Sequence, residues 1–148
     1  MKVSTRVRYG VRLMLELALN YGSGQMRLRD IAQRQEVSGK YLEHLVAALK
    51  AAGLVRGMRG RHGGYVLARP PSEIPLNEIH AALEGSLAPV ECVDDPEVCS
   101  REKLCVARDI WCEVTNAMRK VLESTTLQDL VDRQHEKLNV DGQSMYYI

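Results

Sequence analysis

The sequence predicts a mainly α-helical protein: a winged helix-turn-helix with a small β-hairpin as its wing, followed by a long C-terminal dimerisation helix. Two observations predict this class. Apolar residues recur at three- and four-residue steps through most of the chain, which is typical of amphipathic helices. A pair of closely linked helical segments is followed by two short segments that suit β-strands, and a glycine-rich turn over residues 60–64 separates these strands. At 148 residues, the chain is long enough to bury a core.

A first helix is expected over residues 4–20. Ser4 or Thr5 is suited to cap its N-terminus, and the segment 21–24 (Tyr-Gly-Ser-Gly) ends it. Its apolar positions at helical spacing are Val7, Val11, Met14 or Leu15, and Ala18.

Two shorter helices are expected over residues 28–35 and 38–52. The link between them is short, and Ser38 can cap the second helix while Val37 packs beneath it. Two short helices joined in this way resemble a helix-turn-helix, in which the second helix reads DNA.

Residues 54–59 and 65–69 are expected to form a two-stranded hairpin. Gly53 is placed to end the preceding helix, and the glycines of the 60–64 turn permit positive φ. Pro70 and Pro71 then close the unit, so the sequence divides into a winged-helix DNA-binding region, residues 1–70, and a second region, residues 71–148.

The second region is expected to hold a short helix over residues 77–84, a polar loop over 86–103 and a long helix over about 104–124. A last short helix begins at Thr126, and the tail after Leu138 has no clear pattern. The long helix carries an apolar stripe that is broad for one small domain to cover and is suited to a dimer seam. The stripe consists of Ile110, Trp111, Val114, Ala117, Met118, Val121 and Leu122.

Charge is distributed unevenly along the chain. Residues 1–70 contain thirteen lysines and arginines against four acidic residues, a net charge of +9, whereas residues 71–148 contain seven against fifteen, a net charge of −8. A basic half of this density is what binding to a phosphate backbone requires. No membrane span or signal peptide is expected, so we expect a cytoplasmic protein. We also find no constellation typical of an enzyme.

The expected DNA contacts lie at the start of the second short helix and at the tip of the hairpin. A recognition helix contacts base edges with its N-terminal residues. Glu43 can accept a hydrogen bond from cytosine but repels phosphate, so it would favour sequence selection at the expense of affinity. The other candidates are Ser38, Lys40, Tyr41 and His44 on the helix, and Arg59 and Arg61, with His62, on the wing, which would enter the minor groove.

All four cysteines of the chain, Cys92, Cys99, Cys105 and Cys112, lie between residues 92 and 112. In a reducing compartment such a group indicates a metal site or a redox sensor, because thiolate is the soft ligand of iron–sulfur and zinc sites. Zinc is the weaker alternative, since the short Cys-x₂₋₄-Cys pair of structural zinc sites is missing.

Several segments together resemble the IscR-like regulators of the Rrf-type family of bacterial winged-helix transcription factors. The resemblance covers about residues 1–132. It rests on MKVSTRVRYG at 1–10, SGKYLE at 38–43, RGRHGGYVLAR at 59–69, the three-cysteine loop, Trp111, and TLQDL at 126–130. It implies a homodimer in which the long helices pair and each subunit presents a winged helix to one half-site of a double-stranded promoter operator.

The resemblance also implies a [2Fe–2S] cluster held by three cysteines and by a histidine three residues after the third cysteine. Cys92, Cys99 and Cys105 match those cysteines, with one extra residue between the first two, but the histidine position is Arg108. A guanidinium cannot ligate iron because it stays protonated. The position at which a nitric-oxide-sensing branch supplies an aspartate is Arg8, which argues against that branch.

The fourth ligand therefore stays open. Cys112 lies two helical turns beyond Cys105, roughly 10 Å away at 1.5 Å per residue, and is either a ligand or a small buried residue beside Trp111. A nearby carboxylate or a residue from the partner's first helix is an alternative.

The sequence thus predicts a transcriptional regulator, a repressor or an activator, that senses iron–sulfur cluster status and controls cluster assembly genes. Partnership with the iron–sulfur assembly machinery would fit. Two hypotheses compete with it: a metal-free thiol-switch regulator of cysteine or redox metabolism, and an iron–sulfur redox protein that does not bind DNA.

Overall fold

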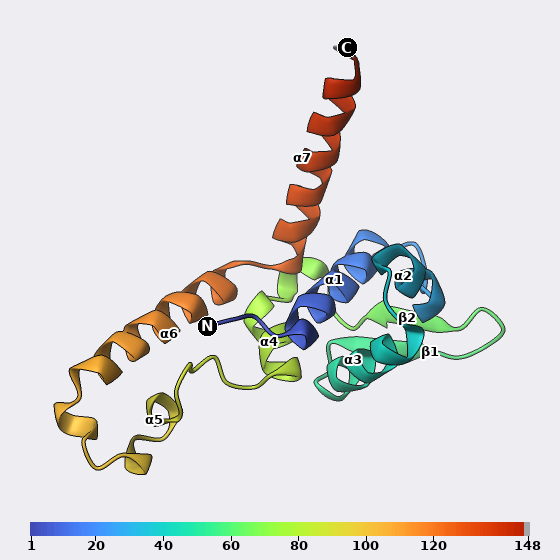
Figure 1. The fold of residues 1–148 in the computed structure, drawn as a ribbon. Coiled ribbons are helices and arrows are strands. Elements are labelled where there is room, and N and C mark those ends of the chain that lie inside the picture. Colours follow the sequence, from blue (N-terminus) through green and yellow to red (C-terminus); the bar gives the residue numbers. More distant parts are fainter. Residues whose placement is uncertain (147–148) are drawn as a thin grey trace.

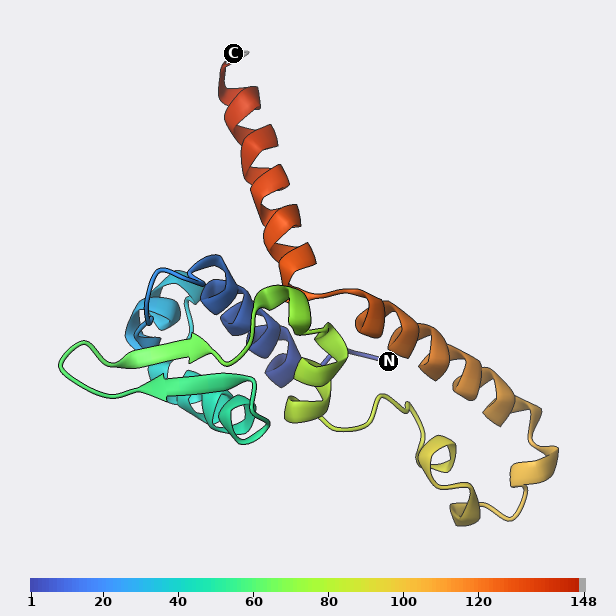
Figure 2. The same cartoon turned by 180° about the vertical axis from the view of Figure 1, so that it is seen from behind.

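The structure, a computed structural model, describes residues 1–146 and consists of a helical body from which two helices project (Figure 1). The body contains α1 to α4, a two-stranded hairpin and the first part of α7. A loop carrying α5 leads away from the body, and α6 returns to it (Figure 2). The elements are α1 (Thr5–Leu19), α2 (Leu28–Gln35), α3 (Gly39–Ala51), β1 (Val55–Met58), β2 (Gly64–Leu67), α4 (Leu76–Leu83), α5 (Glu91–Asp94), α6 (Val106–Ser124) and α7 (Leu127–Tyr146), with short 3₁₀ turns at Pro71–Glu73, Pro96–Val98 and Glu102–Leu104.

The helix-turn-helix of α2 and α3 agrees with the sequence-based prediction. Ser38 caps α3 and accepts a hydrogen bond from the Tyr41 N–H at 3.1 Å. Glu36, at the end of α2, has φ 55° and ψ 42°, a left-handed conformation that is uncommon for a residue with a side chain. This conformation reverses the chain within the short link, so α3 begins close to the end of α2.

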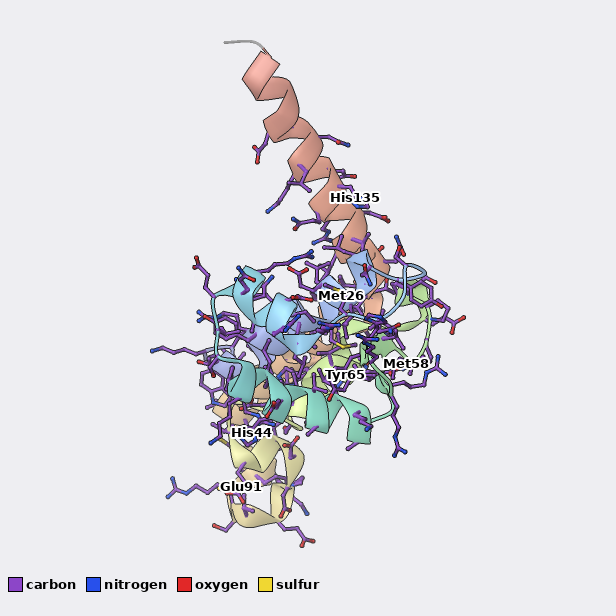
Figure 3. All side chains as sticks on the ribbon, turned by 90° about the vertical axis from the view of Figure 1, so that its right-hand side faces the viewer. Met26, His44, Met58, Tyr65, Glu91 and His135 are labelled. Carbon is purple, nitrogen blue, oxygen red and sulfur yellow. The ribbon has the colours of Figure 1, made fainter. Side chains whose placement is uncertain are left out.

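The hairpin is antiparallel, with Val55 opposite Leu67 and Met58 opposite Gly64. The segment before α2 adds a further bridge: Met26 and Tyr65 exchange backbone hydrogen bonds of 3.0 and 2.8 Å. Figure 3 shows Met26 beside Tyr65. This pairing, which the sequence did not predict, ties the wing to the start of the helix-turn-helix.

The buried core joins residues from both sides of the predicted division at residue 70. From α1 and α3 it includes Leu13, Met14, Leu45 and Leu49, all essentially inaccessible to solvent. It continues into the following segments with Ile74, Ile79, Leu83, Leu127 and Val131.

The α6–α7 junction is anchored to the segment before α4. Thr126 pairs with Pro75 in an antiparallel bridge, and the backbone N–H groups of Leu76 and Leu127 donate to Thr125 and Ile74 at 2.9 Å each. Thr126 and Asp129 cap α7 reciprocally, and the N–H donated by Thr126 to the Asp129 carboxylate lowers the pKa of that carboxyl. A lowered pKa means that the folded protein favours the charged carboxylate. The cap therefore stabilises the folded state fully at a pH above the pKa that Asp129 has in the unfolded chain, and this stabilisation is lost as the pH falls through the pKa in the folded state.

Two segments differ from the sequence-based expectation. The loop expected over residues 86–103 contains α5 and two 3₁₀ turns, because local hydrogen bonds such as Asp95 N–H to the Glu91 carbonyl (3.0 Å) form without burial of apolar residues. The tail after Leu138, which showed no clear pattern, continues α7 to Tyr146. Residues 138–141 of this helix are exposed, so burial imposes no apolar periodicity on them. Within the described residues, no helix is long and apolar enough to cross a membrane.

We expect Gly64→Ala to lower the free energy of unfolding by about 2 kcal/mol, because a Cβ at Gly64 would collide with the backbone carbonyl of Met26. Gly39, at the first position of α3, has open space around it, and Gly39→Ala is the matched control, expected to be neutral or slightly stabilising. Urea denaturation of both variants tests this. Equal stability of the two variants would contradict the close approach at Gly64.

Candidate DNA-binding surface and cysteine loop

The outer face of α3 presents the side chains predicted to read DNA. Lys40, Glu43 and His44 are exposed, and their spacing places them on one face of the helix. Figure 3 shows His44 on the outer side of α3. Ser38, also exposed, holds the first turn through its cap. The structure therefore brings four of the predicted contacts together at the accessible N-terminal part of α3.

Tyr41, a fifth predicted contact, has a different environment. Its ring is half-buried and meets the ring of Tyr9 edge-on, with the two centroids 6.1 Å apart. Its hydroxyl is buried and has no hydrogen-bond partner among the described residues. In this structure Tyr41 thus packs α3 against α1, and its contact with phosphate stays a prediction.

The wing presents Arg59 and Arg61 at the exposed tip of the hairpin. The turn between the strands is tight, since a Cβ at Gly63 would lie 2.8 Å from the Met58 carbonyl oxygen. At the base of this turn, Gln25 donates to the His62 carbonyl and the Arg27 guanidinium lies 3.4 Å from His62 Nδ1. Side chains from the segment before α2 therefore brace the wing.

The cysteines are distributed along the loop and α6. Cys92 lies in α5, Cys99 follows the next 3₁₀ turn, Cys105 precedes the first residue of α6, and Cys112 is within α6. All four are free thiols; Cys99 is exposed and the other three are half-buried. Within residues 1–146, no three His, Cys, Asp or Glu side chains are gathered as a metal site. The donor types suit an iron–sulfur cluster, but the present arrangement does not assemble them.

Arg108 connects the loop to α6. Its Nε donates to the Cys92 carbonyl at 2.8 Å, and its guanidinium lies 3.7 Å from the Glu102 carboxylate. Both side chains are largely shielded, with 17% and 28% of their surfaces exposed. The sequence identified Arg108 as unable to ligate iron; its structural contacts were not predicted, because they depend on how the loop folds back.

The apolar stripe of α6 is partly covered in the single chain, where Val114, Met118 and Leu122 are half-buried. Ile110, Trp111 and Val121 expose 52%, 37% and 63% of their surfaces. Thr115 is buried, and its hydroxyl donates to the Trp111 carbonyl at 2.7 Å within the helix. Cys112, next to Trp111, is half-buried.

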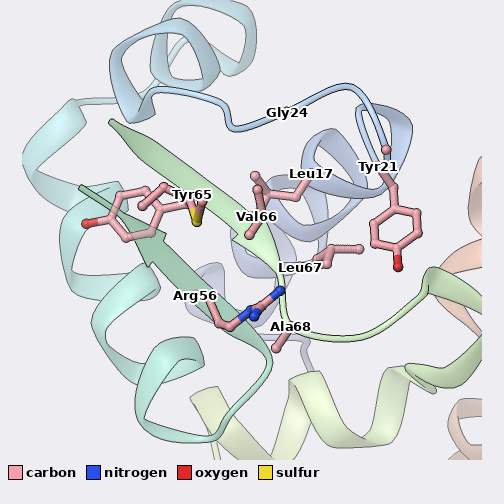
Figure 4. A pocket seen from close by; sticks show the side chains of 10 residues that line it. Leu17, Tyr21, Gly24, Arg56, Tyr65, Val66, Leu67 and Ala68 are labelled. Carbon is pink, nitrogen blue, oxygen red and sulfur yellow. The ribbon is translucent and has the colours of Figure 1, made fainter. Parts of the chain in front are cut away.

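A groove of about 400 Å³ lies between the end of α1 and the hairpin (Figure 4). Leu17, Tyr21, Met58 and Val66 line it, together with Arg56. It contains no cysteine and none of the predicted DNA contacts.

Comparison with known proteins identifies close similarity to bacterial regulators. The family described as Rrf2, iron-dependent transcriptional regulator, matches residues 3–133. The HTH-type transcriptional regulator CymR of Bacillus subtilis is 45% identical over 130 residues, covering 88% of this chain and 89% of that protein.

Two solved structures have the same fold. The structure of CymR, described as the global cysteine regulator of B. subtilis, has a TM-score of 0.76 and 42% identity, over 90% of this chain and 98% of that one. The structure of T. potens IscR has a TM-score of 0.78 and 39% identity, over 93% and 90% of the two chains. The winged-helix fold predicted from the sequence is thereby confirmed.

We expect Arg108→Ala to lower the free energy of local opening of residues 91–104 by about 1 kcal/mol. The substitution removes a charge-assisted hydrogen bond to the Cys92 carbonyl and the ion pair with Glu102. Amide hydrogen exchange of the metal-free, reduced protein should accelerate there severalfold. Arg119→Ala is the control, since Arg119 is on α6 and, among the described residues, its side chain forms a hydrogen bond with Asn116 alone. Unchanged exchange in Arg108→Ala would show that these contacts do not hold the loop.

Proposed function

Because this chain belongs to the Rrf2 family of transcriptional regulators, we propose that it is a homodimeric DNA-binding regulator whose cysteine loop senses iron–sulfur status. It would act in the cytoplasm, without enzymatic activity, on promoters of iron–sulfur assembly genes. The observation that carries this proposal is the pairing, in one chain, of an exposed basic winged helix with a loop rich in free thiols.

The geometry of the winged helix supports DNA binding. The exposed N-terminal part of α3 can enter the major groove, where Lys40 and His44 face the duplex and Glu43 discriminates between bases. Arg59 and Arg61 at the wing tip would reach the adjacent minor groove, whose negative potential attracts arginine.

The exposed stripe of α6 supports a dimer. A soluble chain rarely leaves this many large apolar side chains along one helix uncovered, and pairing α6 with the same helix of a second copy would bury Ile110, Trp111 and Val121. Two winged helices would then meet two half-sites of one operator.

A [2Fe–2S] cluster is supported by the donor chemistry of the loop. Cys92, Cys99 and Cys105 would supply three thiolates, and the cluster would provide a group whose presence depends on iron supply and oxidation. Arg108 stands where the related branch has its fourth ligand, so the remaining ligand in this chain would come from Cys112, a carboxylate or the partner subunit.

A second candidate is a metal-free thiol switch in control of cysteine or redox metabolism. It is favoured by the distribution of the four thiols along the loop and α6, and by the hydrogen bond through which Arg108 connects the loop to α6. A relative described as a cysteine regulator gives it further support.

Arg59→Ala should weaken binding to a selected operator roughly tenfold, because the minor-groove interaction is removed.

Glu43→Ala should strengthen binding to unrelated duplexes, because it removes a carboxylate that repels phosphate. The difference in affinity between the operator and random DNA should therefore become smaller. Fluorescence anisotropy at fixed salt measures both effects, with Arg119→Ala as the control. A chain that binds no duplex would overturn the DNA-binding function.

Protein purified without oxygen should contain about two iron and two sulfide per chain and absorb visible light. Cys99→Ala should lose the iron and sulfide together with the visible absorption. Arg108→His, which restores a possible ligand, should retain the cluster in air for longer than the unmodified protein does. Cys112→Ala tests the fourth ligand, and loss of the spectrum would assign that role to Cys112.

A colourless, iron-free protein would contradict the cluster and favour the thiol switch. In that case, mild oxidation should form a disulfide among Cys92, Cys99 and Cys105 and change the affinity for DNA.

A further inference from the structure

The first helix carries a cluster of two arginines on one aromatic ring. The guanidinium carbons of Arg8 and Arg12 each lie 5.0 Å from the centre of the Tyr9 ring. Arg8 and Arg12 are four residues apart, which places them one above the other on an exposed face of α1. Like charges at this spacing repel, so the stability of the helix alone would not favour the pair.

The charge of the pair is not neutralised within the protein. Among the described residues, neither Arg8 nor Arg12 forms an ion pair with a carboxylate. Glu16, one turn beyond Arg12, instead pairs with Arg34 at 3.2 Å and accepts a 2.6 Å hydrogen bond from Gln35. Arg12 donates only to the neutral amide of Gln35. In the single chain, two positive charges thus remain available to an external anion.

The cluster lies beside the DNA-reading helix. The Tyr9 ring meets Tyr41, in the first turn of α3, and Ser38 caps that same turn. The N-terminus of α3 adds the partial positive charge of its unpaired N–H groups. An anion near Arg8 and Arg12 would therefore flank the part of α3 that carries Lys40 and His44.

We propose that Arg8, Tyr9 and Arg12 form a third contact with DNA, at the phosphate backbone bordering the groove that α3 enters. The Tyr9 ring orients both guanidiniums through cation–π contacts, which lowers the entropy lost when they grip phosphate. This contact rests on the proposed DNA-binding function and extends it from α3 and the wing to α1. It is independent of base sequence, because phosphate carries no sequence information.

Salt titration tests the contact. Arg8→Gln and Arg12→Gln should each weaken binding about threefold to tenfold, equally for a selected operator and a scrambled duplex. Each should also reduce the slope of log K against log salt by about 0.9 for every phosphate that the variant no longer neutralises. Arg119→Gln removes the same charge from α6 and should leave both affinity and slope unchanged. Circular dichroism and thermal melting confirm that the variants fold.

Tyr9→Leu keeps an apolar side chain at this position but removes the ring, and should reduce affinity less than loss of an arginine. Unchanged affinity and slope in the double variant Arg8→Gln/Arg12→Gln would overturn the proposal while leaving DNA binding intact. Failure of the unmodified chain to bind any duplex would instead overturn the proposed function, and this contact with it.

Discussion

The packing of α1 against its neighbours is the contact on which the rest of the structure depends. Its inner face, with Leu13, Met14 and Leu17, is almost completely buried, and each such side chain contributes about 1.5–3 kcal/mol when removed from water. Gly10 lets Leu83 of α4 approach so closely that a Cβ there would collide with it. Arg6 reinforces this approach by donating to the Leu83 carbonyl at 3.0 Å. Since α1 also packs against α3 and α7, the positions of the DNA-reading helix α3 and of α7 are set by one common element.

This arrangement gives the cysteine loop a continuous path of packed elements to the DNA-binding surface. Arg108 joins the loop to α6, α6 packs against α4, and α4 packs against both α1 and α3. A path of this kind transmits a signal only if an element along it has two arrangements of similar free energy. The loop is the element with the fewest buried contacts, because none of residues 84–104 is buried. It is therefore the place where a ligand or an oxidant could change the structure at the lowest energetic cost.

Features with a local chemical cause were predictable from the sequence. Apolar periodicity defined α1, α2 and α3, and the glycines of residues 60–64 marked the hairpin. Ser38 was recognised as a cap, and Ser4, the cap of α1, was one of two candidates with Thr5. The Met26–Tyr65 bridge and the contacts of Arg108 were not predictable, because they join residues far apart in the sequence. Residues 138–141 of α7 lacked an apolar pattern because they are exposed and so are under no requirement to face the core. For the site, residue types were sufficient to nominate the thiols and the exposed face of α3. They could not reveal that the hydroxyl of Tyr41 is buried or that the thiols stand apart.

The segment that holds the loop and α6 leaves the body at the end of α4, after Leu83, and returns beside the start of that same short helix. The hydrogen bonds between Leu76 and Thr125 and between Leu127 and Ile74 close this junction. The whole segment is thus an insertion between two neighbouring points of the body. The length of the loop within it and the positions of its cysteines can therefore change without breaking the connections inside the body, as long as α6 keeps its packing against α4. One ancestral winged-helix protein could in this way give rise to regulators that respond to different chemical signals.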